Sequence, residues 1–461
     1  MERRSLLAWT ALAVALAALR LPMLLLPGLG RDEAAYVYWS HHPEPAYAPL
    51  LQILVALGRG LPTILEARLP SVLAGALVLG LFARLLAQRG MVLRDRWIAV
   101  ALVGLCPWQT YAGTILHPDD LQLAAVLGFV VAAGDRRAWW AVVIAGLAPW
   151  TKPSGALVVV VAAVWILRGG FVGRARAAAW ALLFALALPP LFAMDPPLLR
   201  GLLAFGSSDA DLFRRVSAFV LGSVVLAGPA LPLVGLRGVV ELRNGSRDLG
   251  KHLGLLFVIA FGAAAVVTGQ VKGNWMLPAI LLLWPHTMTW RAPTAGVALL
   301  TTALLSAALT ISFVRVDWSR AVEERWVELP SYLMVAGERE ADVASASAWW
   351  HRPAEYRPVE FPCPDGLEVV VSDDYGLASQ WILSCPNPVP RLVLPLDPVF
   401  HDPGATIPRG AIVLAVRHEV ADLIAERAWE PMDPVAHPIT GAPIQRARVT
   451  DDSPAFERSE P

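Results

Sequence analysis

Charged residues are scarce in this sequence, and lysine and cysteine are scarcer still. Only 16% of the 461 residues are charged, whereas about 25% is usual for a soluble domain. The hydrophobic share is 56% and the mean hydropathy is +0.53. The formal net charge is zero, so nothing indicates a nucleic-acid partner. With 18 Trp residues, which favour bilayer interfaces, this composition predicts a membrane protein in contact with lipids.

Long apolar runs recur along the first two-thirds of the chain. A spanning helix needs about 20 apolar residues. The first run, 6–26, could be read as a cleaved signal peptide, but it is long and no convincing small-residue cleavage site follows it. We therefore expect a retained helix and about eleven spans. The expected spans are 6–26, 68–87, 97–116, 120–134, 138–151, 154–167, 177–194, 216–236, 252–270, 274–290 and 294–314.

Basic residues predict the orientation, because cytoplasmic loops carry an excess of Lys and Arg. With the N-terminus inside, the expected inner loops hold most of them: Arg84, Arg89, Arg94, Arg96, Arg136, Arg137, Arg168, Arg174, Arg176, Arg237, Arg243, Arg247, Lys251 and Arg291. The expected outer loops hold fewer: Arg31, Arg59, Lys152, Arg200, Arg214, Arg215 and Lys272. An odd number of spans then places the chain after residue 314 outside the cytoplasmic membrane.

The chain changes character after the last apolar run. We expect a transmembrane domain over residues 1–316 and an extracytoplasmic α/β domain over 317–450. The second contains the strand-like runs LEVVVSD, RLVLPL and GAIVLAV, and the helix-like runs DYGLASQWIL and HEVADLIAERA. Residues 451–461 are expected to be disordered. The tail also holds Cys363 and Cys385; a disulfide is permitted outside the cytoplasm, but their spacing leaves the bridge open.

Four polar sites fall on the expected outer side of the membrane. They are Asp32 with Glu33, His117 with Asp119 and Asp120, Lys152, and Lys272. Each has a structural explanation. Loop carboxylates are usually solvated, acids at a helix start favour the helix dipole, and lysines reach toward the interface. The chain has only three lysines, however, and two of them lie at this side, where orientation rules favour none. Their convergence predicts a functional site.

Motifs along most of the chain resemble a known family. RDEAAYVYWSHH, HPDDLQLAAVL, LAPWTKPSGALVVV, KGNWMLPAILLLWP and VVVSDDYGLASQWIL occur in the order found in polyprenyl-phosphate-dependent glycosyltransferases of the C superfamily. The sequence most resembles the bacterial aminoarabinose-transferase-like and mannosyltransferase-like group. The resemblance implies transfer of a sugar from a polyprenyl-phosphate donor to a glycan, lipid or protein acceptor.

The resemblance also implies residue roles. Asp32 aligns with the family's catalytic carboxylate, with Glu33 beside it. Arg31, Lys152 and Lys272 are expected to bind the donor phosphate. Asp119, Asp120 and His117 are expected to bind the acceptor or a metal, or to supply a second carboxylate; Asp119 could instead hold a lysine in place. Where the family carries a charged residue or His before Pro-Pro-Leu, this chain reads PAYAPL, so a metal site there is in doubt, although His41, His42 and Glu44 lie nearby. The need for a divalent metal stays open.

This chemistry has a physical basis. An acceptor hydroxyl or amine must lose a proton while the leaving phosphate gains negative charge. A carboxylate can take the proton, and burial or a neighbouring acid makes it a better base; Asp32 beside Glu33 has such a neighbour. Positive groups stabilise the phosphate. The family further implies inversion at the anomeric carbon.

Two other classes of protein are possible from the sequence. A transporter is the main alternative, but ionisable residues are nearly absent from the middle of the expected spans and no repeated halves are visible. A sensor that uses the outer domain as a receptor is the second. The sensor would differ from an enzyme in not needing Asp32 for any turnover.

Overall fold

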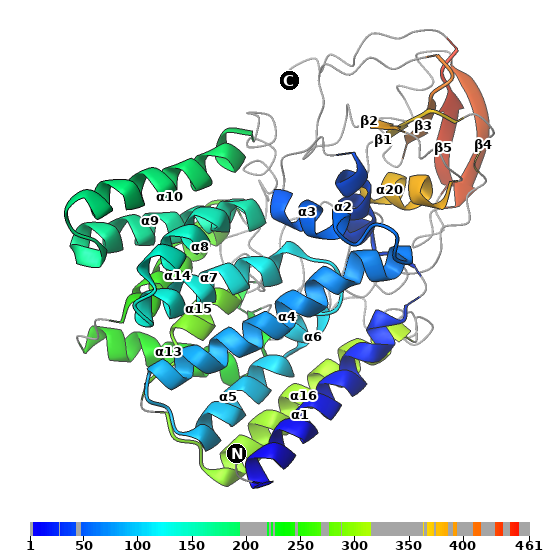
Figure 1. The fold of residues 1–461 in the computed structure, drawn as a ribbon. Coiled ribbons are helices and arrows are strands. Elements are labelled where there is room, and N and C mark those ends of the chain that lie inside the picture. The colour runs from blue at the N-terminus through cyan, green and yellow to red at the C-terminus, as the bar shows by residue number, and fades with distance from the viewer. Residues whose placement is uncertain are drawn as a thin grey trace.

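The structure is a computed structural model of the chain, drawn in Figure 1. It describes residues 3–26, 28–42, 48–193, 219–220, 223–224, 226–244, 248–268, 276–286, 288–314, 363, 367–372, 375–385, 391–393, 409–415, 429–436 and 443–450. A bundle of apolar helices forms most of the molecule, and a small sheet lies at one end of it (Figure 1). We call this the α2 end of the bundle, because helix α2 lies there.

The helices of the bundle follow the apolar runs of the sequence. They are α1 (Arg3–Leu24), α2 (Arg31–His41), α3 (Pro49–Ala56), α4 (Thr63–Gln88), α5 (Leu93–Gly104), α6 (Pro107–Ala112), α7 (Pro118–Gly134), α8 (Ala138–Thr151), the short η1 (Pro153–Gly155), α9 (Ala156–Trp165), η2 (Ile166–Gly170), α10 (Gly173–Ala193), α13 (Ala230–Arg243), α14 (Leu249–Thr268), α15 (Leu277–Leu282) and α16 (Ala292–Val314). By length and composition, four described helical segments could cross a membrane: Thr63–Gln88, Pro153–Gly170, Gly173–Phe192 and Ala292–Ile311.

Several expected spans coincide with helices of the structure, and two need correction. The run 138–151 is helix α8 with the same limits. The run 97–116 is not one helix, because the chain breaks after α5 and Pro107 opens the separate short helix α6. Proline suits the first turn of a helix, where its missing N–H has no intrahelical partner. The run 274–290 contains only the short helix α15 among its described residues.

The bundle packs around α4 and α7. Helix α4 contacts α5 and α7, α7 also contacts α8, and α8 contacts α10, while α1 lies beside α16 (Figure 1). Small residues allow the closest approaches: a Cβ atom added to Gly75 of α4 would lie 2.9 Å from the Cα atom of Gly113, just after α6. The buried core includes Phe82 and Trp284, whose rings meet edge to face. The helices thus form one packed body.

The C-terminal part forms the expected α/β domain. Strands β1 (Val369–Ser372), β2 (Arg391–Val393) and β3 (Ile412–Ala415) match the three expected strands, and α20 (Tyr375–Ser384) matches the first expected helix. Strands β4 (Glu430–Ala436) and β5 (Pro443–Arg448) were not expected. The sheet order is β2-β1-β3-β5-β4; β1 is parallel to β2 and β3, and β5 is antiparallel to β3 and β4.

The α/β domain shares a second hydrophobic core with α2. Tyr36, Tyr38 and Trp39 of α2 are at most 6% exposed, and α2 packs against α20, as Figure 1 shows. From the sequence alone, AAYVYWSHH is expected to form a short helix along the membrane interface, because Tyr36, Tyr38 and Trp39 have apolar bodies and polar tips. The structure has the helix. The position expected for its aromatic rings is wrong, because the rings are buried against the α/β domain. Trp381 of α20 is fully buried in the same core.

Cys363 and Cys385 form a disulfide, with Cα atoms 5.5 Å apart. The bridge ties the end of α20 to the chain that leads into β1. The expected domain boundary at 316/317, the helix expected in HEVADLIAERA and the tail 451–461 lie outside the described residues.

Candidate active site

Asp32 and Glu33 lie in the first turn of α2, but in different surroundings. Gly30 precedes the helix, and its N–H donates to Glu33 Oε2 at 3.0 Å, so the side chain of Glu33 helps to cap the start of its own helix. Glu33 is 1% exposed, whereas Asp32 is half-buried. The positive end of the helix dipole stabilises both carboxylates. The motif therefore splits into a partly accessible acid and a buried one.

Glu33 forms a buried ion pair with Arg68 of α4. Arg68 Nε lies 3.1 Å from Glu33 Oε1, and Arg68 Nη2 lies 3.1 Å from Oε2. Arg68 has no exposed surface. The expected role of Glu33 as a neighbouring acid that tunes Asp32 loses its basis, because the charge of Glu33 is already matched by Arg68. In the sequence, Arg68 marks only the start of an expected span. Its charge next to an apolar run is the signal that could have indicated a buried partner, since such charges need one.

Glu33 also reaches the chain that enters α7. Glu33 Oε1 accepts from the N–H of Leu116 at 3.0 Å, and the N–H of His117 donates to Ser71 Oγ of α4 at 3.2 Å. The first two expected sites, separated by more than 80 residues, are thereby brought together. His117 then caps α7: its Nδ1 accepts from the N–H of Asp119 at 3.3 Å.

The ring of His117 also contacts a carboxylate and an aromatic side chain. Asp119 Oδ1 lies 3.5 Å from its Nδ1. The ring meets Trp108 edge-on, with centroids 5.1 Å apart. His117 therefore caps the start of α7, and its ring packs against Trp108.

Asp119 and Lys152 form the second ion pair of this end of the bundle. Lys152 Nζ lies 2.6 Å from Asp119 Oδ1, and the two residues are 9% and 8% exposed. Lys152 follows the last residue of α8, so the start of α7 and the end of α8 are joined by their side chains. The structure thus brings together Lys152 and Asp119, which the sequence placed at separate outer turns.

The turn that carries Lys152 is tightly built. After Lys152 the chain makes the one-turn helix η1, and a Cβ atom added to Gly155 would lie 2.2 Å from the carbonyl oxygen of Ala148. Only glycine allows the chain to fold back this closely on α8. Gln122 of α7 donates to Ser154 Oγ at 2.6 Å across the same turn.

Asp120 points away from Asp119, into the bundle. It is fully buried, and Gln109 of α6 donates to its Oδ2 at 2.7 Å. Arg20 of α1 lies nearby: a Cβ atom added to Gly113 would lie 3.0 Å from Arg20 Nη1 and 3.1 Å from Gln109 Nε2. Asp120 is in the first turn of α7 and Arg20 is near the end of α1, so both ionisable groups lie at helix ends and not in the middle of the expected spans.

Other expected site residues are only partly placed. Lys272 and Glu44 lie outside the described residues, and Arg31 begins α2. His41 ends α2 and its Nε2 lies 3.1 Å from Glu66 Oε1 of α4. Within the described ranges, no group of three or more His, Cys, Asp or Glu side chains is arranged to hold a metal ion.

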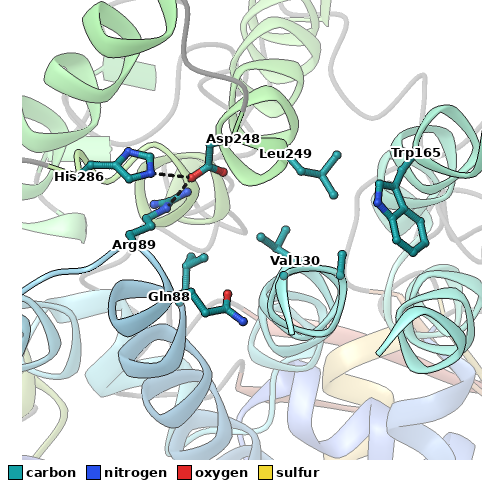
Figure 2. A pocket seen from close by; sticks show the side chains of 10 residues that line it. Gln88, Arg89, Val130, Trp165, Asp248, Leu249 and His286 are labelled. Atoms are coloured by element: carbon teal, nitrogen blue, oxygen red, sulfur yellow. Dashed lines mark hydrogen bonds and ion pairs between the residues drawn. The ribbon is translucent and has the colours of Figure 1, made fainter. Parts of the chain in front are cut away.

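A separate polar cluster lies at the opposite end of the bundle, in the region expected to hold inner loops. Figure 2 shows its side chains. Arg89 Nε lies 2.7 Å from Asp248 Oδ2, and Arg89 Nη1 and Nη2 donate to the carbonyls of Trp284 and Leu282. His286 Nε2 lies 3.3 Å from Asp248 Oδ2. Burial raises the pKa of Asp248, but the nearby charge and hydrogen bonds of Arg89 outweigh it and leave that pKa lowered.

These groups line a cavity of about 480 Å³ whose other wall is apolar. Val130, Leu249 and Trp165 line the apolar wall, and Gln88 lies beside Arg89, as Figure 2 shows. The carboxylate of Asp248 forms an ion pair with Arg89, so the charges on the polar side of this cavity neutralise each other. The cavity lies away from the cluster of Asp32, Asp119 and Lys152.

Comparisons with known proteins give a structural likeness alone. No known protein-family model and no curated protein matches the sequence. Crystal structures of ArnT from Cupriavidus metallidurans, in the apo state and bound to undecaprenyl phosphate, each align with 95% of this chain. They match over 97% and 98% of the ArnT chain at 15% identity, with TM-scores of 0.55 and 0.56. The chain therefore has the fold of ArnT over nearly its whole length, and the expected polytopic helical membrane fold with a small C-terminal domain is confirmed.

Proposed function

We propose that this protein is a membrane glycosyltransferase of the C superfamily. It moves a sugar from a polyprenyl-phosphate donor to an acceptor on the outer face of the cytoplasmic membrane. The observation that carries the proposal is the meeting of the acidic start of α2 with the Asp119–Lys152 pair at one end of the bundle. The shared fold with a protein solved with undecaprenyl phosphate supports the class of donor.

The proposed roles follow from charge and exposure. Asp32 is the partly accessible acid and serves as the base that takes the acceptor's proton. The ammonium of Lys152, held by Asp119, faces the developing charge of the donor phosphate, as Arg31 and Lys272 are also proposed to do. A base on one face of the sugar and phosphate on the other gives direct displacement with inversion.

The proposed orientation places the α2 end outside the cytoplasm. Disulfides persist in oxidising compartments and are rare in the cytosol. The Cys363–Cys385 bridge of the α/β domain, which packs on α2, supports this side. The excess of Arg in the loops at the other end agrees with it.

Purified protein incubated with a panel of polyprenyl-phosphate sugars tests the proposal, with release of polyprenyl phosphate as the readout. Asp32→Asn keeps the shape but removes the proton acceptor. It should lower the transfer rate about 10²–10⁴-fold, the usual contribution of a general base, while donor binding survives. Asp135→Asn, which changes an acid paired with Arg84 at the opposite end, is the control and should transfer normally. Wild-type transfer by Asp32→Asn would move the base to another residue.

The buried charges of Arg20 and Asp120 are the observation that favours a transporter, since ionisable groups within a bundle often mark a transport path. Both residues lie beside Gly113, near the entry to α7 and toward the α2 end, and Gln109 donates a hydrogen bond to the carboxylate of Asp120. The release assay separates a transporter from an enzyme. A transporter reconstituted in vesicles would move its substrate across the membrane and leave the sugar on its lipid.

A further inference from the structure

We propose that Arg68 is a positioning residue of the transfer reaction, which holds Asp32 in place relative to the Asp119–Lys152 pair. The inference rests on the proposed function for its catalytic meaning. Its structural content, that Arg68 sets the place of the first turn of α2, can be measured separately.

The guanidinium of Arg68 uses its full set of donors. It faces two oxygens of Glu33 and four backbone carbonyls, those of Met23, Leu24, Leu26 and Gly28, at 2.6–3.2 Å. These carbonyls belong to the end of α1 and the loop that follows, where a helix leaves its last acceptors without intrahelical partners. Arg68 thus holds the segment between α1 and α2, which leads directly to Asp32, in one conformation.

Glu33 connects Arg68 to the segment that carries Asp119. One of its oxygens faces Arg68 Nε and the N–H of Leu116, and the other faces Arg68 Nη2 and the N–H of Gly30. Leu116 lies three residues before Asp119, whose partner is Lys152. A single buried ion pair therefore fixes α2 against both α4 and the entry to α7.

The residue type fits this task. Arginine offers five N–H groups in a rigid plane, whereas lysine offers three on one flexible atom. A lysine would keep the charge beside Glu33 but could not reach four carbonyls as well. Burying two charges is unfavourable in itself, so the pair is better explained by what it orients than by the stability that it adds.

Arg68→Lys is the main test variant. We expect kcat to fall about 10²-fold, since a displacement of about 1 Å can have that effect, while the donor Kd changes less than about twofold. Glu33→Gln is the milder variant if Arg68→Lys folds poorly; it keeps the size of the side chain and leaves Arg68 its carbonyl partners. Its kcat should fall in the same direction.

Two controls separate positioning from general weakening. Arg84→Lys changes the other bidentate arginine of α4, which pairs with Asp135 at the far end of the helix, and should leave kcat unchanged. Phe82→Ala removes a buried ring of α4 and should lower the thermal midpoint at least as much as Arg68→Lys. For each variant, the loss of kcat is compared with the loss of thermal midpoint. If both variants lose the same kcat per degree of midpoint, the effect of Arg68→Lys is general weakening and the positioning role is refuted.

A second readout needs no activity. Asp32→Cys adds one half-buried thiol to a chain whose described cysteines are either bridged or buried. Its rate of alkylation by a charged maleimide should change several-fold when Arg68→Lys is added, and not when Arg84→Lys is added. An unchanged rate and an unchanged kcat would overturn the inference. A changed rate in a protein that transfers no sugar would keep the positioning role and refute the proposed function.

Discussion

Replacing Lys152 by Met removes one partner of a buried ion pair. Breaking such a pair destabilises a protein by about 3–5 kcal/mol, because it leaves an uncompensated buried charge. The stranded charge here is Asp119, 8% exposed and in the first turn of α7. The helix dipole stabilises a carboxylate there by about 1 kcal/mol. The net loss should therefore be about 2–4 kcal/mol, visible as a lower thermal midpoint in detergent.

The double variant Lys152→Met/Asp119→Asn separates stability from binding. Without either charge, no carboxylate is stranded, so most of the midpoint should return. Donor binding should not return, because the phosphate still lacks its ammonium. A hydrogen bond to a charged group contributes about 1.5–3 kcal/mol, which corresponds to about a 10–150-fold weaker Kd. Both variants should show this loss.

The assay is a titration of purified wild-type and variant protein with polyprenyl phosphate, next to a thermal melt of each sample. If the double variant binds the lipid as tightly as the wild type, Lys152 only holds Asp119 and is not a phosphate ligand. If Lys152→Met has the same thermal midpoint as the wild type, the 2.6 Å contact does not stabilise the protein.

Three further predictions concern other parts of the chain. Because the pKa of Asp248 is lowered on folding, its stabilising effect is present above the unfolded-state pKa of about 3.9 and is lost as the pH falls through the folded-state value; Asp248→Asn should therefore melt below the wild type at pH 7, and the two melting curves should converge in acid. Gly155→Ala places a methyl group against the end of α8 and should lower stability by about 1–3 kcal/mol, whereas Gly80→Ala, where nothing lies within 4 Å, should be neutral or slightly stabilising by the same melt. Protease added outside right-side-out vesicles should remove the region after residue 314, and protection of that region would reverse the proposed orientation.

The membrane-embedded fold followed largely from composition, because an apolar run of sufficient length has few alternatives to a helix. The limits of α8 were predicted to the residue, while the break after α5 was missed because an apolar run was followed without regard to Pro107. Strand β4 was missed for another reason. It contains Pro431 and Pro434, which suit only an edge of a sheet, and β4 is an edge strand.

The candidate site was predicted as a set of residues but not as a set of contacts. Asp32, Asp119 and Lys152 were found because rare charged residues are conspicuous in an apolar chain. Arg68 is equally conspicuous but was taken only as the start of an expected span. Its partners could not be predicted, since four of them are backbone carbonyls, which every residue carries. That Asp119 pairs with Lys152 while Asp120 points into the bundle toward Gln109 also needed the helix direction of α7.

The shared core of α2 and α20 has a consequence for synthesis. Gln380 of α20 donates to the carbonyl of Leu29, just before α2, across 351 residues of chain. At about 5–20 residues per second, α2 leaves the ribosome roughly 20–70 seconds before the segment that covers its aromatic face. During that interval the bundle can insert, but Tyr36, Tyr38 and Trp39 have no sheet or α20 to bury them. The helix that carries Asp32 thus acquires its final surroundings only after α20 and the sheet that pack on it have been made.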